Sequence, residues 1–372
     1  MDLTQNMDQL LKGMAKHGAS DLHLKTGVQP YYRISGRLHK LDYPALENSA
    51  AVDELIRPIV PDEKWQRYQE QGSLDLSYRD DYGNRYRINV FRSMGDSTAA
   101  FRRINSDIPS YESLHLPKIY NNLIEKTFDG LVLVGGVTGC GKSTTLAAML
   151  EHVNSTRGVH IITLEDPVEY TFKNEKAIVS QREIGLDVPS FHDALKYLMR
   201  EDPDVVFIGE MRDRDTMMAA IQAAETGHLV FGSIHTQDCM QSLARILEFF
   251  PRQEHDFIRS SLANSLSGVL CQRLIPAVDP EIGRVPATEV LLGNATVREK
   301  IRRTEDEDIP AIISGSADDG MRNFTTSLAE LIAKDMIAAK VAYEYAPSPE
   351  ALKSKVKGIE VSAATMVGRM KG

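Results

Sequence analysis

A glycine-rich segment at residues 136–143 constrains the fold of this chain more than any other feature. It reads Gly-Val-Thr-Gly-Cys-Gly-Lys-Ser and fills every fixed position of the phosphate-binding pattern Gly-x4-Gly-Lys-[Ser/Thr]. The apolar run 131–134 before it is typical of a buried strand, and 143–150 after it has the pattern of a helix. A strand, a glycine loop and a helix in this order form a P-loop. We therefore expect an α/β fold that binds the phosphates of a nucleotide.

Each part of this loop has an expected role. Backbone N–H groups converge on phosphate oxygens, and the N-terminus of the following helix adds a partial positive charge. Lys142 is expected to reach the β- and γ-phosphates, and the Ser143 hydroxyl to ligate Mg2+. The alternative is a glycine turn before an ordinary helix. The predicted nucleotide-binding residues of the loop are Gly136, Val137, Thr138, Gly139, Cys140, Gly141, Lys142, Ser143 and Thr144.

The composition indicates more than one domain and no membrane span. The 372 residues suffice for two or three units that each bury a core. No apolar run approaches the roughly 20 residues of a transmembrane helix. The polar N-terminus lacks the basic start and the apolar stretch of a secretory signal. We therefore expect a cytoplasmic protein.

Net charge and cysteine spacing argue against several further classes of protein. The formal net charge is −9 at pH 7, so a general nucleic-acid binder is not expected. Cys140, Cys239 and Cys271 are far apart in sequence and form no Cys-x2-Cys pair. This spacing argues against a disulfide framework and against a four-cysteine zinc module.

Changes of pattern along the chain predict five segments. Residues 1–106 look like a small α+β domain, and the irregular, proline-containing stretch 107–116 like a linker. Over 117–290, apolar strand-like runs alternate with helical patterns, which is typical of an α/β domain with a parallel sheet. Residues 291–345 resemble a helical subdomain and 346–372 a loosely held tail.

Several helices and strands can be placed within these segments. The first domain is expected to contain a helix over 3–17, a polar helical stretch over 53–71, and a hairpin made of 85–91 and 98–104. Residues 169–185 resemble a hairpin inserted in the α/β domain. The expected central strands of that domain are 131–134, 159–164, 204–208 and 229–234.

Acidic residues at two strand ends are expected beside the loop. Glu210 follows an apolar strand whose carboxyl end would lie near the P-loop, where it can orient or deprotonate an attacking water. Gly209 occupies the position where an aspartate usually supports Mg2+, so that support is expected from Glu165 and Asp166. The predicted metal ligands are thus Ser143 and Glu165. The alternative for Glu165 and Asp166 is a solvated acidic turn before a proline.

Two histidines flank the strand 229–234. His235 follows its carboxyl end, where sensing of the γ-phosphate would occur, and His228 precedes its amino end. A structural hydrogen-bonding role is the alternative for each. No third histidine or cysteine shares a ligand spacing with them, which argues against metal binding. Both are candidate catalytic residues.

The first domain carries arginines at strand spacing. Arg85 and Arg87 share one face of the run 85–91, Arg92 lies on the other face, and Arg102 follows on the partner strand. One interpretation is a solvated strand face. The other is that one or more of these residues act as arginine fingers on a bound nucleotide.

With these motifs the chain resembles the secretion-type hexameric ATPases, and among them the type IV pilus retraction (PilT-type) motors. The resemblance runs from residues 18–24 to 320–324. Besides the P-loop it rests on 163–169, 200–213 and 223–236. The Ala-Ala-Glu-Thr-Gly-His sequence in the last segment is similar to the retraction branch. The assembly branch usually carries a four-cysteine zinc motif that this sequence lacks.

The resemblance implies a PAS-like α+β N-terminal domain and a RecA-like P-loop NTPase domain with a helical C-terminal extension. It further implies a homohexamer with ATP and Mg2+ between subunits, a catalytic Glu210, and a magnesium and water site assisted by Glu165 and Asp166. His228 and His235 match a conserved box of the family. The implied partners are an inner-membrane pilus platform protein and other pilus motor ATPases, and the implied location is the cytoplasmic side of the inner membrane.

The sequence departs from the retraction motors at two places. The loop reads Gly-Val-Thr-Gly-Cys-Gly where Gly-Pro-Thr-Gly-Ser-Gly is usual, a change at variable positions. The signature Ala-Ile-Arg-Asn-Leu-Ile-Arg-Glu is only echoed by 296–303. Three alternatives therefore stand beside a retraction motor: an accessory (PilU-type) or assembly-type ATPase, a RecA-like nucleic-acid translocase, and an ATP-responsive scaffold that does not hydrolyse.

Overall fold

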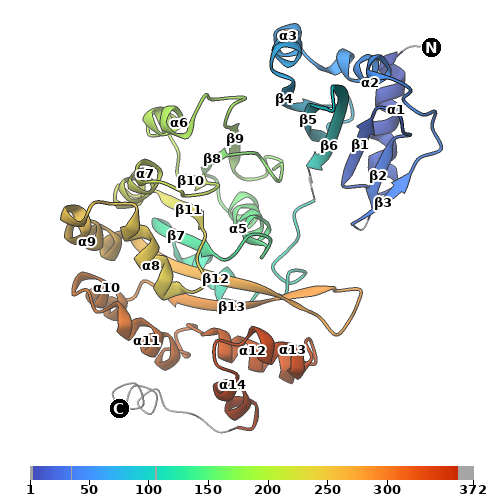
Figure 1. The fold of residues 1–372 in the computed structure, drawn as a ribbon. Coiled ribbons are helices and arrows are strands. Elements are labelled where there is room, and N and C mark those ends of the chain that lie inside the picture. Colours follow the sequence, from blue (N-terminus) through green and yellow to red (C-terminus); the bar gives the residue numbers. More distant parts are fainter. Residues whose placement is uncertain (1–2, 35, 105–106, 359–372) are drawn as a thin grey trace. The chain divides into compact units, whose positions relative to one another are not determined.

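The computed structural model describes residues 3–34, 36–104 and 107–358, and it divides into two units (Figure 1). The first unit reaches Asp107 and the second begins at Ile108. Each unit has its own sheet and its own buried core. The two units are therefore described separately.

The first unit is an antiparallel sheet in the order β3-β2-β1-β6-β5-β4, packed against helices. Its core joins side chains of the helices, such as Met7, Leu11 and Leu55, to Leu22 and Phe101 of the sheet. Alternation along the strands supplies the buried face. The elements are α1 (Leu3–Lys16), β1 (Asp21–Lys25), β2 (Tyr31–Ile34), β3 (Arg37–Lys40), α2 (Ser49–Ile56), η1 (Arg57–Ile59), α3 (Asp62–Gln71), β4 (Ser73–Arg79), β5 (Arg85–Ser93) and β6 (Asp96–Ile104).

Two predictions for this unit are confirmed. The helix expected over 3–17 is α1, and the expected hairpin is β5 and β6. The strands extend further than the sequence indicated, because only Met94 and Gly95 form the turn. Both have positive φ, 56° and 91°, as the two-residue turn that matches strand twist requires.

The single helical stretch expected over 53–71 is wrong. The chain forms α2, which ends at Ile56, and α3, which begins at Asp62. Pro58 and Pro61 lie between them and have no N–H to donate to a helical hydrogen bond. The prolines therefore divide the stretch into two helices.

The second unit contains a seven-stranded sheet in the order β13-β12-β7-β11-β10-β8-β9, parallel except for the edge strand β13. Its elements are α4 (Ile119–Lys126), β7 (Gly130–Gly135), α5 (Lys142–Thr156), β8 (His160–Glu165), β9 (Ile178–Glu183), α6 (Phe191–Leu198), β10 (Val205–Ile208), α7 (Arg214–Glu225), β11 (Leu229–Ile234), α8 (Cys239–Glu248), η2 (Arg252–Glu254), α9 (His255–Ser265), β12 (Leu266–Pro276), β13 (Arg284–Leu292), α10 (Ala295–Arg302), η3 (Asp306–Asp308), α11 (Ile309–Gly315), α12 (Phe324–Ala333), α13 (Ala339–Tyr345) and α14 (Pro349–Val356).

The central strands of this sheet are covered on both faces. Every residue of β7, β10 and β11 is buried, which explains their continuous apolar sequences. Side chains of α4 and α5 pack on one face and those of α6 to α9 on the other, so α5 and the group α7, α8 and α9 lie on opposite sides in Figure 1. The four expected central strands are confirmed as parts of β7, β8, β10 and β11.

Both edges of the sheet differ from expectation. The hairpin expected over 169–185 is wrong, because β9 pairs parallel with β8, with Ile178 opposite His160. At the other edge β12 and β13 form a long antiparallel pair that the sequence did not indicate. Polar residues such as Gln272 and Arg273 interrupt the apolar pattern of β12. A search for apolar periodicity therefore does not identify this strand.

The C-terminal region is helical beyond the predicted limit. Helices α10 to α13 are followed by α14, whose Leu352 is fully buried in the core of the second unit. The loosely held tail expected over 346–372 is therefore wrong for its first part, since burial of an apolar side chain fixes α14 in place. Residues 359–372 of that expected tail lie outside the described residues.

Candidate functional site

Residues 136–141 link β7 to α5 in a loop whose first position accepts only glycine. Gly136 has φ 154°, and a Cβ there would lie 2.2 Å from the Cys140 Sγ and 2.8 Å from the Gln272 carbonyl oxygen. Helix α5 begins directly after the loop at Lys142, so the N-terminus of the helix and its partial positive charge lie at the loop. The predicted order of strand, loop and helix is confirmed.

The Lys142 side chain folds back over this loop. It is buried, and its Nζ donates to the carbonyl oxygens of Gly136 at 2.8 Å and Val137 at 3.3 Å. The Nζ also lies 3.4 Å from Nδ1 of His235. An ammonium in this position places positive charge at the mouth of the phosphate loop.

His235 connects Lys142 to Glu210 across two neighbouring strand ends. Strand β11 ends beside β7, with Ile234 opposite Gly135, and β10 ends beside β11, so the residues that follow these strands meet at one edge. Nε2 of His235 lies 2.8 Å from Oε1 of Glu210. When Nδ1 accepts from Lys142, Nε2 carries the proton and donates to Glu210. The predicted convergence of Lys142, Glu210 and His235 is therefore present.

Arg212 is a further partner of Glu210. Its Nη2 donates to Oε2 of Glu210 at 2.6 Å, and this hydrogen bond is the main cause of the lowered pKa of Glu210. Burial opposes that shift, while the charges of His235, Arg212 and Lys142 add to it. Glu210 is therefore an ionised hydrogen-bond acceptor near neutral pH, suited to orienting a water molecule more than to holding its proton.

Glu165 is the last residue of the next strand of the sheet, β8, which pairs with β10, and Asp166 follows it. Glu165 is buried, and its Oε1 accepts hydrogen bonds from Thr163 Oγ1 at 2.6 Å and Gln181 Nε2 at 3.1 Å. Asp166 is exposed and, after Glu210, contributes to the raised pKa of Arg212. Both acidic residues thus lie on the same sheet edge as Glu210, with Glu165 buried and hydrogen-bonded and Asp166 exposed to solvent.

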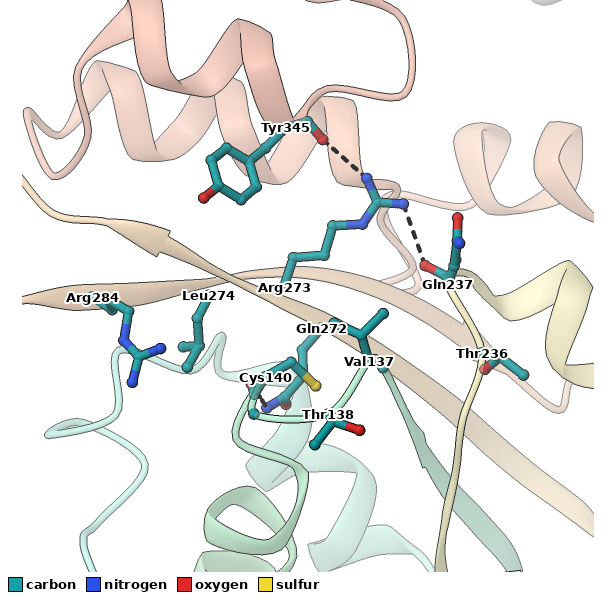
Figure 2. A pocket seen from close by; sticks show the side chains of 12 residues that line it. Val137, Thr138, Cys140, Thr236, Gln237, Gln272, Arg273, Leu274, Arg284 and Tyr345 are labelled. Atoms are coloured by element: carbon teal, nitrogen blue, oxygen red, sulfur yellow. Dashed lines mark hydrogen bonds between the residues drawn. The ribbon is translucent and has the colours of Figure 1, made fainter. Parts of the chain in front are cut away.

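A cavity of about 350 Å³ lies on the β12 side of the loop. Figure 2 shows Val137, Thr138 and Cys140 at its lower boundary, with Arg273 and Tyr345 above them. The size is that of a small-molecule site. Ser143 and Thr144 do not line this cavity; they lie in the first turn of α5 and are half-buried.

The structure does not bring His228 to this edge. The residue precedes β11, at the opposite end of a six-residue strand from His235, which corresponds to about 20 Å. Its Nδ1 lies 3.0 Å from the Ala223 carbonyl oxygen and 3.2 Å from Thr226 Oγ1, where it ties the end of α7 to β11. The structural hydrogen-bonding role given as the alternative is therefore present, and a catalytic role of His228 stays a prediction.

The four arginines lie in the first unit, on the strands where they were expected. Arg87 is exposed and faces Arg102 across the β5–β6 pair, while Arg102 donates to Asp21 at 2.9 Å. Arg92 donates to the Gln69 carbonyl oxygen. Arg85 begins β5 opposite Ile104. Contact of any of them with a nucleotide stays a prediction.

Sequence reasoning missed two polar residues of the site. Arg212 lies two positions after Glu210, and this proximity was a signal that was not used. Gln272 contacts the loop from β12, a strand that the sequence did not indicate, so no local signal pointed to it. Arg212 contacts Glu210 and Gln272 contacts Cys140, two residues that the sequence did identify.

Comparison with known proteins now adds to this geometry. The sequence profile of the family described as "Type II/IV secretion system protein" matches residues 2–311. The chain belongs to this family. It is 39% identical over 350 residues to the "Type IV pilus retractation ATPase PilT" of Pseudomonas aeruginosa, covering 94% of this chain and 99% of that protein. It is 36% identical over 323 residues to a "Twitching motility protein" of Neisseria gonorrhoeae, covering 87% of this chain and 86% of that protein.

Solved structures of related proteins share the fold. The structure described as "Crystal Structure of the Pilus Retraction Motor PilT and Bound ADP" is 38% identical, covers 93% of this chain and 98% of its own, and has a TM-score of 0.85. The Legionella pneumophila ATPase DotB follows at 25% identity and a TM-score of 0.73. The predicted fold class is confirmed: a PAS-like α+β first unit and a RecA-like second unit with a helical C-terminal extension.

Membership of this secretion ATPase family also supports nucleotide use by the chain. Among the helices of the described residues, none has the length and apolar character needed to cross a membrane.

Proposed function

We propose that this chain is an ATPase motor of a type IV pilus machine and that its ATP hydrolysis drives pilus retraction and twitching motility. The observation that carries the proposal is the connected set Lys142, His235 and Glu210 at one sheet edge. It joins a phosphate-binding lysine to a carboxylate suited to the attacking water. The names of the relatives, a pilus retraction ATPase and a twitching motility protein, supply the machine on which it acts.

In the proposed reaction each group has a separate task. The loop N–H groups and Lys142 bind the β- and γ-phosphates, and Glu210 accepts a hydrogen bond from the water and orients it toward the γ-phosphorus. His235, bonded to both Lys142 and Glu210, registers whether the γ-phosphate is present. Glu210, whose pKa is lowered chiefly by the hydrogen bond from Arg212, is ionised and available to the water throughout the physiological pH range.

Ser143 and Glu165 would hold Mg2+ together with the substrate. Among the residues that the structure describes, no group of three His, Cys, Asp or Glu side chains could hold a metal. This fits Mg2+, which is bound through one or two protein oxygens plus phosphate oxygens and waters. Glu165 offers a carboxylate fixed by Thr163 and Gln181. The ion would neutralise the charge that develops on the phosphates.

Further positive charge for the phosphates is proposed to come from a neighbouring subunit of a homohexamer. The candidates are Arg85, Arg87, Arg92 and Arg102 of the first unit, whose guanidinium groups could pair with phosphate oxygens. The proposed partners outside the ring are an inner-membrane pilus platform protein and other pilus motor ATPases. The proposed location is therefore the cytoplasmic side of the inner membrane.

A second candidate is an accessory motor. The chain is 34% identical over 350 residues to the "Type IV pilus ATPase PilU" of Pseudomonas aeruginosa, covering 94% of this chain. An accessory subunit would hydrolyse ATP with the same residues, so the catalytic geometry does not separate the two roles.

Deletion of the gene, followed by electron microscopy of pili and a twitching assay, tests the function. A retraction motor predicts excess surface pili and loss of twitching, both restored by the wild-type gene and not by a Lys142→Ala variant. An accessory motor predicts retraction that fails only under load or in the absence of a second motor. Loss of pili would point to assembly and contradict the proposal.

A further inference from the structure

The side chain of Gln272 lies between the phosphate loop and α5. It is buried, with 2% of its surface exposed, and it makes two hydrogen bonds. Its Nε2 donates to the Cys140 carbonyl oxygen at 2.7 Å, and its Oε1 accepts from Thr145 Oγ1 at 2.9 Å. Figure 2 shows Gln272 reaching down from β12 to Cys140. One amide therefore joins the loop to the helix that follows it.

The topology of the sheet places this amide. Strand β12 runs parallel to β7, with Cys271 opposite Gly135, the last residue of β7. Strand β12 continues past that point, so Gln272 is the next residue and lies level with the loop. Alternation turns Cys271 to one face and Gln272 to the other, the face that carries α5.

The orientation of the amide is set by its two partners. A carbonyl oxygen can only accept, so the NH2 group must face Cys140. The Thr145 hydroxyl then donates to the oxygen, and Thr145 itself is anchored in the first turn of α5 by its N–H bond to the Gly141 carbonyl oxygen. Gly141 packs directly against the amide, since a Cβ there would lie 3.1 Å from Nε2.

These bonds determine how the next peptide group points. In a planar trans peptide the C=O and the following N–H are directed to opposite sides. Fixing the Cys140 carbonyl on Gln272 therefore directs the Gly141 N–H away from β12. The N–H of this loop position belongs to the set that faces the phosphates in the P-loop pattern. Without the anchor, Gly141 with its φ of 90° has no side chain to hold this peptide in one orientation.

We infer that Gln272 is a positioning residue for the nucleotide phosphates: it holds the Cys140–Gly141 peptide in the orientation that receives them. This inference rests on the proposed ATPase function. Preorganisation of this kind improves binding because the loop does not have to be ordered when the ligand arrives. Gln272 itself does not touch the reacting atoms. We therefore expect it to affect nucleotide affinity more than the rate of the chemical step.

The test uses the full chain and two probes, a fluorescent ADP analogue and inorganic tripolyphosphate as its competitor. Gln272→Met keeps the length of the side chain and removes both hydrogen bonds, and Thr145→Val removes only the hydroxyl that orients the amide. We expect Gln272→Met to weaken both probes by about tenfold, because the bond from Nε2 that orients the Cys140–Gly141 peptide is lost. Thr145→Val should weaken them less, and KM for ATP should rise more than kcat falls.

A double variant and a control separate positioning from general destabilisation. Because Thr145 acts through Gln272, the double variant should bind no more weakly than Gln272→Met alone. Thr98→Val removes a buried hydroxyl that has no hydrogen-bond partner in the described part of the chain, and it should bind both probes like the wild type. If Gln272→Met does not fold, the affinities of Thr145→Val and Thr98→Val for the two probes are compared instead. Weaker binding by Thr145→Val alone supports the inference, and equal binding contradicts it.

Three outcomes would overturn the inference. They are wild-type affinity in both Gln272→Met and Thr145→Val, a fall of kcat with unchanged KM, and weakening of the ADP analogue without weakening of tripolyphosphate. A wild-type chain that binds neither probe would overturn the proposed function and the inference with it. Wild-type binding together with unaltered variants overturns the inference alone.

Discussion

Glu210 combines the features that a water-orienting carboxylate needs. It lies at the edge of the sheet near the loop, bonded to His235 and Arg212. Glu210→Gln keeps the shape and removes the charge, so nucleotide affinity should stay within about threefold while turnover falls by at least about 100-fold. Equilibrium binding and phosphate release measure the two effects. Glu248→Gln, an exposed partner of Arg245 on α8, is the matched control. Undiminished turnover in Glu210→Gln would remove its catalytic assignment.

The pH dependence of this carboxylate follows from Arg212. Glu210 has to be ionised to accept a hydrogen bond from the water, so activity is lost as pH falls through the pKa of Glu210 in the folded chain. Removal of Arg212 takes away the main cause of the lowered pKa of Glu210. Arg212→Met should therefore move the acid limb of the kcat/KM profile to higher pH, while Arg245→Met should leave it in place. An unmoved acid limb would show that Glu210 does not control it.

At the residue scale, the sequence identified the groups whose position follows from strand order. Lys142, Glu210 and His235 each follow a continuous apolar run, and the carboxyl ends of parallel strands share one edge. The sequence also placed His228 correctly before the amino end of β11, at the opposite edge of the sheet from His235. Gln272 and its partner Thr145 could not be paired from sequence, since their contact spans 127 positions and depends on β12.

At the element scale, helix α14 tests whether the C-terminal segment is part of the folded unit. Leu352 is fully buried, so Leu352→Ala should lower the free energy of unfolding of the second unit by about 2–5 kcal/mol, through lost burial and the cavity left behind. Leu186→Ala, at a half-exposed position of the same unit, should cost much less. Thermal unfolding of both variants measures the difference. Equal midpoints would support the loosely held tail that the composition suggested.

Elements that carry a local signal in the sequence could be predicted. Elements whose formation depends on partners distant in the sequence could not. The fully buried strands β7, β10 and β11 read as apolar runs, and the β5–β6 turn carries a local signal in Met94 and Gly95. The parallel pairing of β9 with β8 has no local signal, because turn residues around 169–185 equally fit a hairpin. In β12 the polar residues Gln272 and Arg273, which make hydrogen bonds in the structure, interrupt the apolar pattern on which strand prediction relies.

At the scale of the whole molecule, the proposed composite site divides the work between two subunits. The second unit supplies Lys142 and Glu210, and a neighbouring first unit is proposed to supply an arginine. Arg102 is held by Asp21 and Arg92 lies over the Tyr68 ring, whereas Arg87 is exposed on the open face of β5. Arg87 is therefore the first of the four arginines to substitute.

Mixing two inactive variants distinguishes an arginine supplied by a neighbour from one supplied by the same chain. Lys142→Ala and Arg87→Ala should each hydrolyse ATP poorly alone. In a randomly mixed ring about a quarter of the interfaces pair an intact loop with an intact arginine from the neighbour, so activity should recover to about that fraction. Steady-state phosphate release against mixing ratio measures the recovery. Lys142→Ala mixed with Glu210→Gln is the control and should recover nothing, because both lesions lie in the same half of the site. If the Arg87→Ala mixture also stays inactive although subunits exchange, Arg87 does not complete a neighbour's site.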